Sequence, residues 1–172
     1  PVEPVGSAQR LVRSVKSVRG EISFRMVCEP RFDYGRCAHT ILQKNDSVVF
    51  VPENPKVPAM RLRTSCPLVV EGDAAVSEFT LKGSEEATFV LEEIRGDEPS
   101  PSESPAYVAD ALRSTVGYWR NWISHSAYTG RWRETVNRSA LLLKLLISEE
   151  HGSIIAAPTF GLPEEIGYAV RT

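Results

Sequence analysis

The sequence has few of the residues that build metal sites, and it has no long apolar run. Its 172 residues include three His and three Cys. His39, His125 and His151 lie far apart along the chain, and none stands at ligand spacing from a Cys or an acid, so no metal site is predicted. No apolar run approaches the roughly 20 residues that span a bilayer, so we expect no membrane partner.

The cysteines are too few for a disulfide framework. Cys28, Cys37 and Cys66 are odd in number and lack C-x-x-C spacing, which favours reduced thiols in a cytosolic protein. A disulfide between Cys28 and Cys37, across a turn, is the alternative.

The stretch that follows Pro1 lacks the basic start and apolar segment of a signal peptide. The sequence therefore predicts a cytoplasmic location.

A strong charge of either sign and nucleotide-binding motifs are also lacking. The formal net charge is −2, with acids and bases interspersed, so no nucleic acid partner is expected. The sequence has no Gly-rich phosphate loop and no G-x-S-x-G nucleophile elbow, and we predict no cofactor. Hydrophobic residues make up 42% of the chain and charged residues 24%, which is the balance of a soluble globular protein with a core.

The pattern of apolar residues changes near residues 96–105, a stretch rich in Pro, Ser and acids. Such a composition is typical of an exposed, semi-stiff linker. Apolar residues recur with period two before this stretch and with helical period after it. The sequence therefore predicts an α+β chain in three parts: a partial β-sandwich domain at 1–95, a linker at 96–105 and a helical part at 106–172.

The first part is expected to be an antiparallel β-sandwich. Residues 22–28 alternate between apolar and polar side chains, as a half-buried strand does, and residues 11–18 are expected to pair with them in a hairpin through Arg19-Gly20. Four prolines between 52 and 67 predict edge strands or loops in that region. Short strands joined by turns favour a sandwich, and the further predicted strands are 48–51, 68–70, 76–81 and 87–91.

Two amphipathic helices are predicted in the second part. The first begins near Ser104-Pro105 and ends before Tyr128-Thr129-Gly130. The second has apolar residues from Trp132 to Ile147 and is expected to end at His151-Gly152. Its apolar surface is too broad for one partner helix, so further helices or another chain should cover it. Left uncovered, this face predicts self-association or aggregation.

Three stretches of the chain resemble glycoside hydrolase family 15, which includes bacterial glucoamylase-like enzymes and actinobacterial trehalases. The resemblance covers nearly the whole chain in the family's order. It ends after Gly167, where the family continues with an Arg-Asn-Trp-Asp-Tyr-Arg run that this chain lacks. The three stretches are residues 18–36 with Arg31-Phe32-Asp33-Tyr34-Gly35, residues 118–139 with Tyr128-Thr129-Gly130-Arg131-Trp132, and residues 152–167 with Ala156-Ala157-Pro158-Thr159.

The resemblance implies a fold and an activity for the intact protein. The chain would hold the later part of the family's β-sandwich, a linker helix and the first helix of an (α/α)6-type barrel. The intact enzyme would hydrolyse α-glucans or trehalose with inversion, using two opposed carboxyl groups and no metal or organic cofactor. Both family carboxylates lie beyond the position of Thr172, so no catalytic residue is predicted here, and the chain alone should be a structural and inactive piece.

The resemblance suggests one substrate-binding residue, Phe160, in the loop after Thr159. Glu164 and Glu165 are adjacent and point in different directions, so they cannot flank one glycosidic bond. The aromatic residues between Tyr118 and Trp132 have helical spacing, which favours packing over sugar stacking. Glu29, Asp33 and Arg36 are expected to form a surface ion pair, with a sugar contact as the lesser alternative. The rival function is a free-standing β-sandwich that binds a glycan or a protein.

Overall fold

The computed structural model describes residues 9–44, 47–95, 100–148 and 151–155. The chain divides into two compact units, Pro1–Thr115 and Val116–Thr172, and the division falls within helix α1, Tyr107–Ser124. In the described part of the chain, the first unit holds two antiparallel sheets and the second holds the helix α2, Arg133–Leu145. This confirms the predicted α+β fold, a sandwich followed by two helices.

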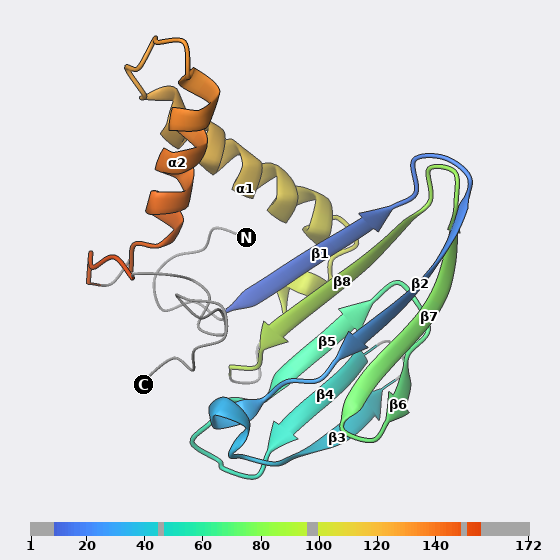
Figure 1. Cartoon of the computed structure of the whole chain (residues 1–172). Coiled ribbons are helices and arrows are strands. Elements are labelled where there is room, and N and C mark those ends of the chain that lie inside the picture. Colours follow the sequence, from blue (N-terminus) through green and yellow to red (C-terminus); the bar gives the residue numbers. More distant parts are fainter. Residues whose placement is uncertain (1–8, 45–46, 96–99, 149–150, 156–172) are drawn as a thin grey trace, which may run out of the picture. The chain divides into compact units, whose positions relative to one another are not determined.

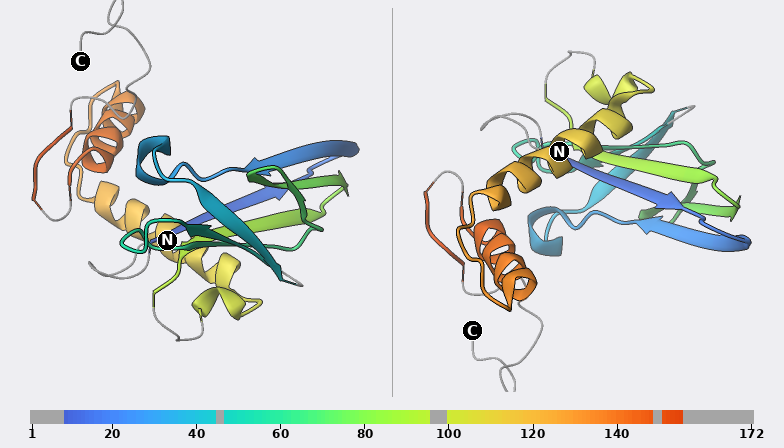
Figure 2. Two further views of the ribbon diagram at one scale, coloured as in Figure 1. Left: turned by 90° about the horizontal axis from the view of Figure 1, so that it is seen from below. Right: turned by 90° about the horizontal axis from the view of Figure 1, so that it is seen from above.

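The two sheets of the sandwich differ in size (Figures 1 and 2). The larger has five strands in the order β1-β8-β5-β4-β3, and the smaller has three in the order β2-β7-β6. All neighbouring strands are antiparallel. The strands are β1 (Arg10–Lys16), β2 (Glu21–Cys28), β3 (His39–Lys44), β4 (Ser47–Pro52), β5 (Met60–Thr64), β6 (Val69–Glu71), β7 (Ala74–Lys82) and β8 (Glu86–Glu93).

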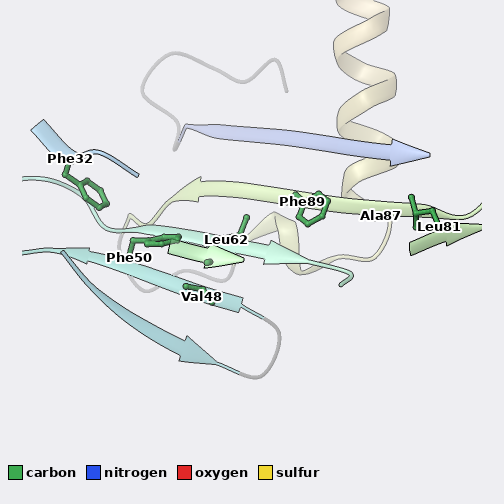
Figure 3. Close-up of a cluster of buried hydrophobic side chains, with 8 residues drawn as sticks. Phe32, Val48, Phe50, Leu62, Leu81, Ala87 and Phe89 are labelled. Atoms are coloured by element: carbon green, nitrogen blue, oxygen red, sulfur yellow. The ribbon is translucent and has the colours of Figure 1, made fainter. Parts of the chain in front are cut away.

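The core lies between the sheets because strands of both turn alternate side chains inward. On β8, for example, Ala87 and Phe89 are buried in it and Leu91 packs against it. The predicted alternation of residues 22–28 is also present, since Phe24, Met26 and Cys28 pack against the core while Val27 is exposed. The buried cluster, drawn in Figure 3, is Phe32, Val48, Phe50, Leu62, Ala75, Leu81, Ala87 and Phe89.

The predicted hairpin between residues 11–18 and 22–28 is wrong. β1 pairs with β8, and β2 pairs with β7, so the Arg19-Gly20 connection passes from one sheet to the other. Figure 1 shows β1 beside β8 and β2 beside β7. Sequence proximity favours a hairpin, but this arch lets both strands add an apolar side to the same core. Val15, opposite Ala87 in the larger sheet, packs on the core in this arrangement.

The proline-rich middle of the chain holds more sheet than the sequence predicts. β5 lies at the centre of the larger sheet, between β8 and β4, although loops or edge strands were expected there. Pro52 ends β4, and Pro55, Pro58 and Pro67 lie outside the strands, so none interrupts a central ladder. β3 was not predicted either, and it forms one edge of the larger sheet, as β6 does of the smaller one.

The helices follow the prediction at their centres and depart from it at one end. α2 ends at Leu145, six residues before the predicted stop at His151. Gly152 does adopt the left-handed conformation expected of it, with φ +66°, but it lies beside an isolated bridge between Ile147 and Ile154. Neither described helix is long and apolar enough to cross a membrane.

A short turn, η1 (Phe32–Gly35), has an unusual backbone. Asp33 and Tyr34 have φ values of 48° and 56°, in the left-handed region that β-carbon contacts disfavour. Phe32 anchors the turn in the core, with its ring 5.4 Å from that of His39. Tyr34 is 92% exposed, so packing of its side chain offsets little of this backbone strain.

Glycine at position 34 should therefore stabilise the sandwich. We expect Tyr34→Gly to raise the free energy of unfolding by about 0.5–1 kcal/mol, because glycine relieves a left-handed cost of about 1–2 kcal/mol and gives back part of it as chain entropy. Urea unfolding measures the change. The matched control is Tyr34→Ala, which removes the same ring, keeps the β-carbon and should change stability little. A loss of stability in the glycine variant alone would contradict the strain.

Candidate functional site

The predicted substrate-binding residue, Phe160, lies outside the described residues, as do Glu164 and Glu165. Its role therefore stays a prediction. The described residues instead bring together an ionic cluster that the sequence analysis did not single out. The cluster is centred on Glu92, near the end of β8, whose side chain is 1% exposed.

Three arginines from neighbouring strands surround the Glu92 carboxylate. Arg10 of β1 and Arg61 of β5 stand directly opposite Glu92 in the two strand registers, so the three side chains share one face of the sheet. The Arg61 guanidinium lies 2.7 Å from Glu92 Oε1, and Arg10 Nε lies 3.3 Å from Oε2. Arg63 is farther, with Nε at 3.9 Å from Oε1.

The segment after β8 completes the shell around Glu92. Ser100 and Ser102 both donate hydrogen bonds to the carboxylate, the latter at 2.9 Å. They flank and form part of a short 3-10 helix, η2 (Pro101–Glu103), in which Ser100 Oγ also caps the backbone N–H of Ser102. Glu103 reaches back to Arg63, with 2.8 Å between Oε1 and Nη2.

This environment does not favour a general-acid role for Glu92. Burial raises the pKa of its carboxyl group, but hydrogen bonds from Ser100, Ser102 and Arg61 and the Arg61 charge outweigh burial and lower the pKa below its usual value. A glycosidase acid needs a raised pKa to hold its proton near neutral pH. We interpret the cluster as a structural ionic centre, because the Glu92 carboxylate is 1% exposed and its described contacts are with side chains of the sheet and of the segment after β8.

A cavity of about 220 Å³ lies in the sandwich, lined by residues of β1, β2, β5 and β8. Its walls are mostly apolar, and one thiol, Cys28, lines it. Burial raises the pKa of the Cys28 thiol to about 11, although the charge of Arg13 acts in the opposite direction. The thiol is thus protonated near neutral pH and is a poor nucleophile. The lining residues are Leu11, Arg13, Met26, Val27, Cys28, Glu29, Pro30, Leu62, Phe89 and Leu91.

All three cysteines are free, as predicted, and the Cys28–Cys37 disulfide is absent. The surface ion pair expected near the η1 turn is present between Arg36 and Asp33, at 2.9 Å, while Glu29 pairs with Arg31. Within the described ranges, no group of three or more His, Cys, Asp or Glu could hold a metal ion.

The apolar face of α2 is largely exposed. No residue of this helix is buried, and Leu145 is 65% exposed. The aromatic residues of the same unit are not deeply packed either. Tyr118 meets Trp119 edge-to-face at 5.3 Å, and Trp132 is exposed with the Arg131 guanidinium 5.0 Å from its ring centre. The described contacts therefore decide neither core packing nor sugar stacking for these rings.

Comparison of the sequence with those of known proteins shows that the chain is homologous to trehalases over most of its length. No protein-family model matches the sequence. No solved structure matches it either.

The relatives include trehalases of mycobacteria and of Thermoplasma species. The chain is 32% identical to the trehalase of Mycolicibacterium smegmatis over 160 residues, which are 90% of this chain and 24% of the relative. It is 30% identical to the trehalase of Mycobacterium tuberculosis over the same length, or 23% of that protein. A shorter match of 56 residues is 52% identical to the trehalase of Thermoplasma volcanium and covers 33% of this chain. The chain thus spans about a quarter of the mycobacterial proteins it matches.

Proposed function

We propose that this chain is the sandwich-and-helix part of a trehalose-hydrolysing enzyme of the glycoside hydrolase family 15 type. The observation that carries the proposal is the trehalase homology over 90% of the chain. The intact protein would split trehalose, or a related α-glucoside, with inversion and through two carboxyl groups held outside this region. Its substrate would be bound by the rest of the enzyme together with the loop that contains Phe160.

In this proposal the described residues have a structural role. The sandwich supplies a folded base, and α2 begins an (α/α)6-type barrel in which further helices cover its apolar face. That cover would explain why a helix with so much exposed apolar surface occurs in a folded protein. Burying apolar side chains such as leucine stabilises the fold by roughly 25 cal/mol per Å², and exposed leucines do not contribute this free energy. Without such cover, the same face would favour self-association.

A cytoplasmic location is part of the proposal. Cys28, Cys37 and Cys66 are all free, which suits a reducing compartment.

Two activity measurements test the proposal. The isolated chain should release no glucose from trehalose, maltose or starch, because the two carboxyl groups that the proposed reaction needs lie outside this region. A chimaera should be active: the M. smegmatis trehalase with its matching region of 160 residues replaced by that of this chain. We expect it to hydrolyse trehalose within about a hundredfold of the parent, the loss that a misplacement of about 1 Å can cause.

The parent enzyme and a substrate blank are the controls, and circular dichroism with size-exclusion chromatography shows whether the chimaera folds. A folded but inert chimaera would contradict the trehalase assignment. Glucose release by the isolated chain would instead overturn its purely structural role. Retention on an α-glucan column without hydrolysis would favour the rival, a glycan-binding module.

A further inference from the structure

The segment that leaves the sandwich is tied to the sheet through a single buried carboxylate. Five described side chains contact Glu92: Arg10, Arg61 and Arg63 from strands, and Ser100 and Ser102 from the segment after β8. The strand arginines and the segment serines thus share one acceptor. Removing that acceptor leaves both groups without their common partner.

The charges make Glu92 the essential member of this set. Three guanidinium groups lie together on this face of the larger sheet, against the carboxylates of Glu92 and Glu103. Glu103 is itself part of the segment, and its side chain is 45% exposed. If the Glu92 charge were lost, Arg61 would lose its buried ionic partner and the two serines their charged acceptor, while the more solvated contacts of Glu103 would remain.

The helix α1 begins only four residues after η2 ends, and its first half belongs to the same compact unit as the sheets. Ala111, on its second turn, is buried. Local hydrogen bonds run continuously through the connection, from Glu103 N to Ser100 O, from Ser104 N to Pro101 O and from Tyr107 N to Ser104 O. If Ser100 and Ser102 are held in place, these hydrogen bonds also fix the position of the first residues of α1.

We propose that residues 100–103 are a strap locked onto the larger sheet by Glu92, which makes the exit from the sandwich a rigid joint that fixes the first turns of α1. Part of a stretch whose composition predicts an exposed, semi-stiff linker then behaves as part of the sandwich. The strap concerns the first compact unit alone, and it holds whether or not the intact protein hydrolyses trehalose.

Amide hydrogen exchange of the full chain tests the strap. In Glu92→Gln, exchange at the amides of Glu103, Ser104 and Tyr107 should become at least about tenfold faster, because the loss of charged hydrogen bonds shifts a local opening equilibrium by that factor or more. The Ser65 amide, bonded to Thr88 O between β5 and β8, reports on the sheet and should accelerate much less. Glu86→Gln, the same change at an exposed position of β8, is the matched control.

A second variant keeps the proposal testable if Glu92→Gln does not fold. Ser100→Ala with Ser102→Ala removes both strap donors and leaves the arginine–carboxylate contacts in place. It should also speed exchange selectively at Glu103, Ser104 and Tyr107. Unchanged exchange at these amides, or equal acceleration at Ser65, would overturn the strap, because either result means that the segment's order does not depend on Glu92.

Discussion

Phe50→Ala should lower the free energy of unfolding of the sandwich by about 3–5 kcal/mol, the usual cost of deleting a buried phenylalanine side chain. Phe50 is 0% exposed and belongs to the buried cluster drawn in Figure 3, and its ring lies 5.6 Å from that of His39. A domain is stable by only about 5–15 kcal/mol, so this loss is a large share of the total. At about 4–8 °C per kcal/mol for a domain of this size, the melting temperature should fall by well over 10 °C.

The matched control for this variant lies on the adjacent strand. Leu42 of β3 is 54% exposed and faces Val49 in the register, so Leu42→Ala should cost less than about 1 kcal/mol. Thermal and urea unfolding of both variants measure the difference. Equal losses would mean that Phe50 does not occupy the interior of the sandwich and would contradict the two-sheet core.

The sequence predicts the layers of this fold better than it predicts the pairing of the strands. Period-two alternation identifies β2 because Phe24, Met26 and Cys28 recur on one side, whereas β4 is recognised as a short apolar run, Val48 to Val51. Which strand lies beside which is set by long-range register, which local periodicity does not encode. The local sequence around Arg19-Gly20 therefore predicts a hairpin, although this turn joins strands of two different sheets.

The ionic cluster illustrates the same limit for the site. Arg61 and Arg63 flank Leu62 with period two, and that alternation signals a strand with charges on one face. Nothing local indicates that Glu92, 31 positions later, stands opposite Arg61. The Pro/Ser/acid composition of the next segment predicts exposure to solvent, yet two of its serines donate hydrogen bonds to a buried carboxylate. Only the folded register brings these groups together.

The second large effect is expected for Glu92→Gln, which should lower stability by about 3–5 kcal/mol near neutral pH, because it removes the buried charge that pairs with the Arg61 guanidinium and accepts hydrogen bonds from Ser100 and Ser102. Its dependence on pH follows from the lowered pKa of Glu92 in the folded chain. A carboxyl group with a lower folded pKa stabilises the protein fully above its unfolded value of about 4.3, and that stabilisation is lost as the pH falls through the folded pKa.

Wild type and Glu92→Gln should therefore differ most near neutral pH and converge in acid, because the wild-type carboxyl group then takes up a proton and resembles the amide. Urea unfolding over a series from neutral to strongly acid pH measures both curves, and the acid limb of the variant should be the flatter one. Glu86→Gln, at an exposed site of the same strand, should follow the wild type throughout. A constant gap between wild type and Glu92→Gln across the acid range would mean that the ionised carboxylate does not hold the cluster together, and that the cost of the variant comes from altered packing instead.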